Sequence, residues 1–423
     1  MALLYKNARL KGKKELEDIL VEDGIIKRIG HNLTSEDLKV TNSIEEHDLE
    51  GNLIIPPYVD PHIHLDYVFT AKKEGALNGT GTLFEGIQRW SETKSDLNIE
   101  EIKERARIAV KKEILHGVQF IRTHADVTDP KLTSLKALLE LKEELKDIVT
   151  IQVVAFPQEG MYAYKDGDKL LEEALKMGAD CVGAIPHFEL AREFGEKSIH
   201  KTVELAVKYN KLIDVHCDET DDDQSRFLEL LAALSYMEGI GEMTTASHTC
   251  SFSSANNSYA FKLMKLLKKS KINFISCPTE NIYLQGRQDT YPKRRGLTRV
   301  KELNDAGINV CFAQDSMSDP WYPLGNGNMM MILDHGIHIA QMMSFEEIDN
   351  DLDLITTNGA ITMNIKDVYG IEENKPANFI VLDAKSEFEA ICERADVISS
   401  VRNGNFLFKK QPQILKSSIE FLR

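Results

Sequence analysis

The sequence lacks the features that mark secreted, membrane-spanning and zinc-knuckle proteins. Its six cysteines lie far apart and include no Cys-x-x-Cys pair, so neither a disulfide framework nor a small cysteine-rich metal module is indicated. No stretch approaches the ~18 uninterrupted apolar residues that a membrane-spanning helix needs. The first residues contain no long apolar segment with a cleavage pattern. We therefore expect a cytoplasmic protein with no membrane partner.

Positive charge is also scarce. The 51 Lys and Arg residues are outnumbered by 67 Asp and Glu residues, which gives a formal net charge of −16. Such a charge repels phosphate backbones and argues against nucleic acid as a partner. Hydrophobic residues make up 42% and charged residues 28% of the 423 positions, a composition typical of a globular protein with one large domain and an appendage.

Strand-like apolar runs alternate with helix-like stretches through the middle of the chain. Leu135 to Leu145 and Leu170 to Met177 show the i, i+3, i+4 spacing of apolar residues in a helix. With the run from Leu53 to Pro57, eight strands are predicted, and repeated βα units favour an α/β fold, a closed (β/α)8 barrel of the TIM type. A doubly wound open sheet is the main alternative, but no Gly-rich phosphate fingerprint follows the first strand. The other seven runs are residues 118–124, 149–156, 181–186, 212–217, 244–249, 272–277 and 308–315.

The two ends of the chain carry further strand-like segments. Asp18 to Val21 and Ile25 to Ile29 flank a turn at Gly24, which is typical of a β-hairpin. Residues 377–383 and 397–408 are also strand-like, with a turn at Asn403-Gly404. Neither end is large enough to bury a core alone. We therefore predict a small β-sandwich domain formed by residues 1–52 and 369–423, beside a barrel of residues 53–368.

Polar side chains follow the predicted strands at the carboxyl ends, where barrel enzymes carry out their chemistry. His62 and His64 are two residues apart after the first strand, so they point to the same face. His216 ends the fifth strand and Asp315 the eighth. Three imidazoles and one carboxylate are a credible ligand set for one divalent metal ion, zinc or iron.

A metal ion lowers the pKa of bound water from ~15.7 to about 7. A general base must then take a proton from the water, and a general acid must protonate the departing group. His248, which ends the sixth strand, and Asp315 are expected close to that water, and Glu219 offers a carboxyl that can shuttle protons. The set suits attack on an sp² carbon that bears an amine or an amide. Gln158 could hold a polar heterocycle, because its amide both donates and accepts hydrogen bonds.

Longer motifs carry a family resemblance that covers nearly the whole chain. On these motifs the sequence resembles the amidohydrolase superfamily and, within it, the bacterial cytosine deaminases. The resemblance implies that His62, His64, His216 and Asp315 bind one zinc or iron ion. The motifs are residues 81–87, 155–160, 183–189, 214–219, 246–249, 284–287, 291–296 and 319–325.

The resemblance also implies a role for the remaining candidates. His248 would orient and activate the hydrolytic water, and Glu219 would protonate the ring nitrogen next to the attacked carbon. Gln158 would bind the carbonyl and N–H edge of the ring. Leu83 and Trp321 would line the pocket. The implied partner is a small-molecule nucleobase, and the implied assembly is a homo-oligomer such as a hexamer.

Two positions refine what the resemblance implies. The fourth strand ends at His187 without the lysine that, once carbamylated, bridges two metals in two-metal relatives, so one metal is favoured. In the cytosine deaminases the metal-binding aspartate is followed by a second aspartate near C5 of the pyrimidine, whereas Ser316 stands here. A smaller side chain enlarges the pocket near C5. The sequence therefore predicts deamination of cytosine, or of a 5-substituted cytosine such as 5-methylcytosine, to the corresponding uracil and ammonia.

Other functions remain open at this point. Isoguanine, isocytosine and creatinine are small rings that the same site could deaminate. A cyclic amide hydrolase acting on a hydantoin or a dihydropyrimidine would keep the fold, but the missing lysine argues against it. A non-catalytic barrel kept for assembly would be expected to have lost metal ligands, and all four candidates are present. Release of ammonia separates the deaminases from the amide hydrolase.

Overall fold

The computed structural model describes residues 2–33, 44–411 and 418–419 of the chain. The chain divides into two compact units, one formed by Met1–Pro57 with Val368–Arg423 and the other by Tyr58–Asp367. We call them the small unit and the barrel unit.

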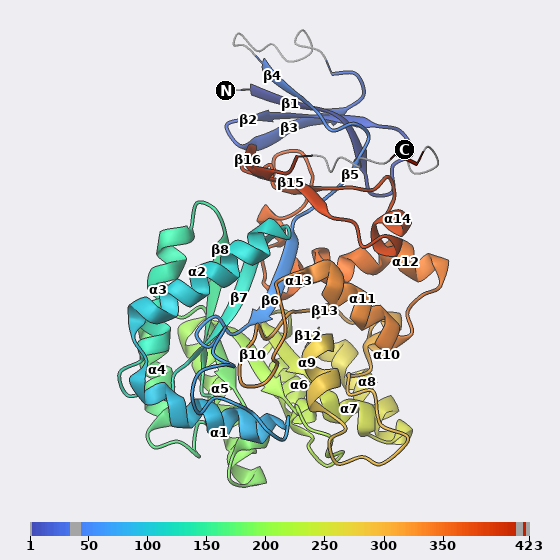
Figure 1. Cartoon of the computed structure of the whole chain (residues 1–423). Helices are drawn as coiled ribbons and strands as arrows, with labels where there is room; N and C mark the ends of the chain where they lie inside the picture. The colour runs from blue at the N-terminus through green and yellow to red at the C-terminus, as the bar shows by residue number, and fades with distance from the viewer. Residues whose placement is uncertain (1, 34–43, 412–417, 420–423) are drawn as a thin grey trace. The chain divides into compact units, whose positions relative to one another are not determined.

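The barrel unit contains eight parallel strands that pair in the order of the sequence, with helices outside them (Figure 1). The prediction of an α/β barrel of eight parallel strands is confirmed. Its strands are β6 (Tyr58–Ile63), β7 (Val118–Asp126), β8 (Thr150–Phe156), β9 (Cys181–Ala184), β10 (Leu212–Cys217), β11 (Thr244–His248), β12 (Asn273–Ser276) and β13 (Val310–Phe312).

The helices of the barrel unit bury one apolar face against these strands. In α3 (Thr133–Leu145), Leu135, Leu138 and Leu141 are fully buried, as the predicted spacing requires. The other helices are α1 (Leu83–Thr93), α2 (Ile99–Leu115), α4 (Gly167–Met177), α5 (Arg192–Tyr209), α6 (Phe227–Glu238), α7 (Cys250–Ser254), α8 (Asn257–Ser270), α9 (Pro278–Leu284), α10 (Val300–Asp305), α11 (Met329–Ala340), α12 (Phe345–Asp351) and α13 (Thr357–Thr362).

The barrel closes at the residues that carry candidate metal ligands. The N–H of Asp315 donates to the carbonyl oxygen of His62 at 2.8 Å, and the N–H of His64 donates to the carbonyl oxygen of Asp315 at 3.2 Å. Nearby, the Asp60 carboxylate accepts a hydrogen bond from the N–H of Gln314 at 3.1 Å. These bonds join β6 to the segment after β13, so the seam of the barrel and the candidate site coincide.

The small unit is a mixed sheet built from both ends of the chain. The strands pair in the order β16-β15-β14-β5-β1-β2-β3, and β4 pairs with β1. Tyr5 joins the two ends, because its ring meets Phe379 edge-on at 5.0 Å and its hydroxyl donates to the carbonyl oxygen of Gly404. The elements are β1 (Ala2–Leu10), β2 (Glu17–Glu22), β3 (Ile25–Gly30), β4 (Ile44–Asp48), β5 (Leu53–Ile55), β14 (Phe379–Leu382), α14 (Glu387–Cys392), β15 (Val397–Arg402) and β16 (Asn405–Lys409).

One predicted strand belongs to the other unit. The sequence predicts that Leu53 to Pro57 is the first barrel strand, whereas β5 pairs with β1 and β14 in the small unit. The first barrel strand is β6, which begins at Tyr58. Pro56 and Pro57 separate the two strands, because proline has no N–H to donate to a sheet.

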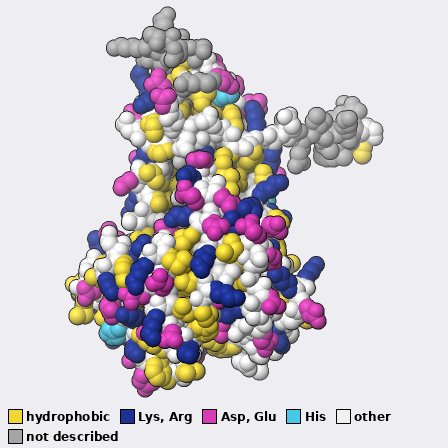
Figure 2. All heavy atoms as spheres, turned by 90° about the vertical axis from the view of Figure 1, so that its left-hand side faces the viewer, with side chains coloured by type: hydrophobic (Ala, Val, Ile, Leu, Met, Phe, Trp, Pro, Cys, Tyr) yellow, Lys and Arg dark blue, Asp and Glu magenta, His cyan; other side chains and the backbone are white. Residues whose placement is uncertain are grey.

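No helix in the described part of the chain is long and apolar enough to cross a membrane. All six cysteines are free thiols, and only Cys392 among them is exposed. On the face drawn in Figure 2, Lys and Arg side chains are interspersed with Asp and Glu, so the described residues of that face form no extended basic surface.

Candidate active site

Three imidazoles and one carboxylate converge at the carboxyl end of the barrel. The Nε2 atoms of His62 and His64 lie 3.2 and 3.1 Å from Nε2 of His216. Asp315 Oδ1 lies 3.6 Å from Nε2 of His62 and 3.5 Å from Nε2 of His64. All four side chains are buried. Ligand atoms of a tetrahedral site with metal–nitrogen bonds of about 2.0–2.1 Å lie roughly 3.3 Å apart, so the cluster fits a divalent metal ion.

The imidazoles of this cluster are held in the form that binds metal. Burial is the main cause that keeps the pKa of His62, His64 and His216 well below its usual range. Repulsion by neighbouring imidazoles adds to this lowering of the pKa. A neutral imidazole has a free lone pair, and that lone pair is what a metal ion needs.

A buried hydrogen-bond chain orients His62 from inside the barrel. Arg122 Nη1 donates to Asp214 Oδ2 at 2.9 Å, and the Ser247 hydroxyl donates to Asp214 Oδ1 at 2.6 Å. His62 Nδ1 lies 3.2 Å from Ser247 Oγ. Because the hydroxyl proton of Ser247 goes to Asp214, its oxygen accepts from Nδ1–H of His62. This leaves Nε2 of His62 as the lone-pair nitrogen that faces the cluster.

The candidate base and acid lie beside the cluster and share one neighbour. His248 Nδ1 lies 3.4 Å from Glu219 Oε1 and 3.8 Å from Asp315 Oδ2. Asn281 Nδ2 donates to Glu219 Oε1 at 3.1 Å and lies 3.3 Å from His248 Nδ1. Burial raises the pKa of the Glu219 carboxyl to about 8, although the bond from Asn281 opposes the shift. Glu219 therefore holds a proton at neutral pH that it can deliver to a ligand.

A narrow pocket adjoins the cluster and is lined by three of its four members, His64, His216 and Asp315. The amide oxygen Oε1 of Gln158 is buried there with no hydrogen-bond partner among the described residues, so it is available to a ligand. All four side chains that the sequence assigns to substrate binding line the pocket, and the full set is His64, Tyr67, Leu83, Gln158, Ile185, His216, Glu219, His248, Glu280, Leu284, Asp315, Ser316 and Trp321.

One wall of the pocket is held by Trp321. Its ring packs on Tyr67 with 4.5 Å between centroids, and its Nε1 donates to the carbonyl oxygen of Leu83 at 3.2 Å. Gly86 of α1 makes room for this ring, because a Cβ at that position would overlap the indole.

We expect Gly86→Ala to lower the free energy of unfolding by about 1–3 kcal/mol, through overpacking against Trp321. Alanine improves helix propensity by about 1 kcal/mol, but the indole is buried and cannot move aside freely. Urea unfolding measures the change. Gly79→Ala is the matched control, since the nearest atom to its Cβ would be Glu85 Oε1 at 3.8 Å. Equal stability of the two variants would contradict the prediction.

Two buried residues beside the site carry no prediction from the sequence, and one of them, Glu280, lines the pocket. Glu280 and Asn281 lie on α9, directly after β12, and both are buried. The signal is present in the sequence, because polar residues follow the seventh predicted strand as they follow the fifth, sixth and eighth.

The sequence leaves the roles of two strand-end histidines open. The rings of His124 and His62 are tilted by 40° with 4.1 Å between centroids, and neither His124 nor His187 lines the pocket.

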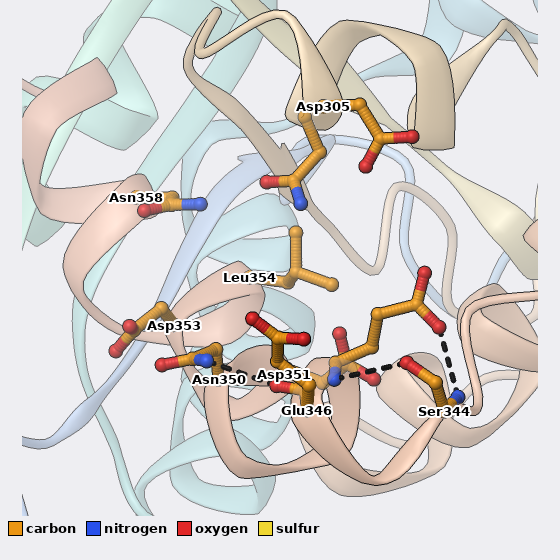
Figure 3. A pocket seen from close by; sticks show the side chains of 10 residues that line it. Asp305, Ser344, Glu346, Asn350, Asp351, Asp353, Leu354 and Asn358 are labelled. Atoms are coloured by element: carbon orange, nitrogen blue, oxygen red, sulfur yellow. Dashed lines mark hydrogen bonds between the residues drawn. The ribbon is translucent and has the colours of Figure 1, made fainter.

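A second hollow lies elsewhere in the barrel unit, where α10 and the segment from Ser344 to Asn358 meet (Figure 3). Its walls carry carboxylates and amides, and the hydroxyl of Ser344 caps α12. In the described residues, every group of side chains able to hold a metal ion instead includes His62, and one of these groups is His62, His64 and His216. We therefore place the candidate site at that cluster.

Comparison with known proteins identifies the family. Residues 45–408 match the model of the Amidohydrolase family. N-isopropylammelide isopropyl amidohydrolase of Pseudomonas sp. strain ADP is 31% identical over 420 residues, which cover 97% of this chain and 98% of that protein. The crystal structure of 5-methylcytosine deaminase from Klebsiella pneumoniae, liganded with 5-fluorocytosine, is 48% identical with a TM-score of 0.94, and the match covers 98% of this chain and 99% of that one. Since both the family model and these relatives match along nearly the whole length, the chain belongs to the amidohydrolase family.

Proposed function

We propose that this protein deaminates a free pyrimidine base with the help of one divalent metal ion, zinc or iron, and that 5-methylcytosine is its preferred substrate. The products are then 5-methyluracil and ammonia. The observation that carries the proposal is a metal-ligand cluster and a proton-holding carboxyl, Glu219, on the walls of one small pocket. The similarity to a 5-methylcytosine deaminase at 48% identity supports the choice of substrate.

His62, His64, His216 and Asp315 would hold the metal ion. The ion supplies a water molecule of lowered pKa, and so a nucleophile at neutral pH. Every other step belongs to side chains of the chain itself.

His248 is placed to orient the water and take its proton, because its Nδ1 faces both Asp315 and Glu219. Glu219 donates its proton to the ring nitrogen next to the attacked carbon, which makes that carbon more electrophilic. The carboxylate of Glu219 then passes a proton from the added water to the amino group, which leaves as ammonia. His248 then returns the proton that it took from the water to Glu219, whose Oε1 lies 3.4 Å from Nδ1, so both side chains regain their starting state and one water is consumed for each ammonia released.

Gln158 would bind the carbonyl and N–H edge of the base through its amide. Its Oε1, which has no hydrogen-bond partner in the described part of the chain, would accept from the ring N–H, and its Nε2 would donate to the ring carbonyl. Leu83 and Trp321 would cover the ring, since both line the pocket and are bonded to each other. A buried site that surrounds a planar ring in this way excludes bulk water from the reaction.

The test is ammonia release by metal-loaded protein with 5-methylcytosine, cytosine, isocytosine, isoguanine, creatinine and dihydrouracil. Treatment with EDTA serves as the control. We expect release from 5-methylcytosine that is lost with EDTA and restored by zinc or iron. Turnover of creatinine or a purine alone would contradict the substrate, and ring opening without ammonia would favour a cyclic amide hydrolase.

Ser316→Asp is expected to lower the ratio of kcat/KM for 5-methylcytosine over cytosine by about 10-fold or more, because one methyl group in a tight pocket accounts for about 10–200-fold discrimination. Ser316 lines the pocket beside Asp315, and a longer side chain there reduces the space for a 5-methyl group. Ser316→Ala is the control and should leave the ratio close to that of the wild type. An unchanged ratio in Ser316→Asp would show that this residue does not face the substituent.

A further inference from the structure

Glu280 is a pocket carboxyl that the proposed mechanism does not use. It lies on α9, lines the pocket and is 2% exposed. Its Oε2 atom has no hydrogen-bond partner among the described residues. A buried carboxylate oxygen without a partner is costly in a folded protein, so its presence in a ligand pocket calls for a ligand donor.

The other side of this carboxyl is fixed by the protein. The Ser316 hydroxyl is near the carboxyls of both Glu280 and Asp319 and lowers the pKa of each, and Ser316 itself follows Asp315 at the seam of the barrel. Asp319, close by, accepts the N–H groups of Trp321 and Tyr322 at 3.0 and 3.1 Å, which holds the loop after β13 in place. Because Oε2 of Glu280 has no partner among the described residues, Ser316 can contact only the other oxygen, and Oε2 is left for the pocket.

The position of Glu280 defines which part of a substrate it can reach. Its carboxyl is near three other carboxyl groups whose charges raise its pKa, those of Asp315, Asp319 and Glu219. In the proposed function the attacked carbon lies among His248, Asp315 and Glu219, so the amino group on that carbon lies beside Asp315. Glu280 lines the same pocket and is close enough to Asp315 and Glu219 for their charges to raise the pKa of its carboxyl, so we infer that its free oxygen can reach that amino group. Gln158 is expected at the carbonyl and N–H edge of the ring.

We propose that Glu280 is the residue that recognises the exocyclic amino group of the substrate, with Oε2 accepting a hydrogen bond from the amino N–H. This inference rests on the proposed function. A carboxylate only accepts hydrogen bonds. The product carries a carbonyl oxygen where the substrate carries the amine, so two acceptors then face each other. Glu280 thus selects the amine-bearing base and promotes release of the carbonyl product.

The charge state of Glu280 in the working enzyme reflects two opposing effects. Burial and the charges of Asp315, Asp319 and Glu219 raise the pKa of its carboxyl well above the usual range. A metal ion held at Asp315 would offset these charges and favour the carboxylate form, because a nearby cation stabilises a carboxylate. The assignment itself depends on the free oxygen and its place in the pocket.

Glu280→Gln tests the assignment, because glutamine keeps the shape and the acceptor for Ser316 but can present an N–H to the pocket. We expect kcat/KM for 5-methylcytosine to fall about 10–100-fold, the range for a hydrogen bond to a charged group. We expect the opposite change for the product. The dissociation constant of 5-methyluracil, measured by calorimetry on the metal-loaded protein, should fall about 3–10-fold, because an amide N–H can bind its carbonyl oxygen.

Thr279→Val is the matched control. Thr279 is the neighbouring buried residue on α9 and does not line the pocket, so the variant should keep both the wild-type kcat/KM and the wild-type affinity for 5-methyluracil. Weaker binding of substrate and product alike in Glu280→Gln would indicate a structural role, and unchanged values would indicate no contact; either result overturns the assignment. If the wild-type protein releases no ammonia from 5-methylcytosine, the proposed function itself is wrong and the inference falls with it.

Discussion

Glu219→Gln is expected to lower kcat for 5-methylcytosine by a factor of about 10²–10⁴, the usual contribution of a general acid–base group. Glutamine can still accept the hydrogen bond from Asn281, so the geometry beside His248 is retained. What it lacks is a proton that can move to the ring nitrogen and then to the leaving amine. The loss should therefore appear in kcat, with KM changed much less.

Steady-state kinetics with ammonia detection measure this effect, and metal analysis checks that the variant binds as much metal as the wild type. Asp222→Asn is the matched control: Asp222 is an exposed carboxylate three residues further on that accepts the N–H of Gln224, and asparagine can do the same. A value of kcat within about threefold of wild type in Glu219→Gln would remove Glu219 from the proton path.

Asp214→Asn is expected to have the largest effect on the folded protein, with a loss of about 3–5 kcal/mol in the free energy of unfolding. Asp214 and Arg122 are fully buried and 2.9 Å apart, so a neutral side chain at 214 leaves the guanidinium without its charge partner. The same change weakens the chain from Ser247 to His62. We expect zinc affinity to fall about 10–100-fold, as when outer partners of metal ligands are removed.

The two consequences can be separated with Ser247→Ala. This variant breaks the link to His62 but keeps the ion pair between Arg122 and Asp214. It should lose about 10–100-fold in zinc affinity and only about 1 kcal/mol of stability from one hydrogen bond. Urea unfolding of the metal-free protein and competition with a chromogenic chelator give the two quantities. Wild-type zinc affinity in both variants would show that Asp214 and Ser247 do not position His62.

The barrel and the meeting of the candidate metal ligands can both be predicted from the sequence, because both follow from the local spacing of apolar runs and polar residues. Apolar runs at regular spacing define parallel strands, and parallel strands bring their carboxyl ends to one face. His216 and His248 could therefore be placed near His62 without any knowledge of their distances. The division between the units is harder to predict, because the apolar run at Leu53 reads the same in either sheet.

Residues that act through partners distant in sequence could not be predicted in this way. The link from Arg122 to Asp214 spans 92 residues and the link from Asn281 to Glu219 spans 62. An arginine within the buried strand β7 gives no local sign of its partner. Glu280 is a similar case, since the role proposed for it depends on Ser316 and on an oxygen with no hydrogen-bond partner among the described residues.

The seam between β6 and the end of β13 has a consequence for biosynthesis. The bond from Gln314 to Asp60 joins residues 254 positions apart, so it can form only after almost the whole barrel has been made. His62 and His64 leave the ribosome early, but the carboxylate that completes their ligand set arrives last. A nascent chain therefore presents two histidines without the closed cage, and stable metal capture becomes one of the final events in the maturation of the protein.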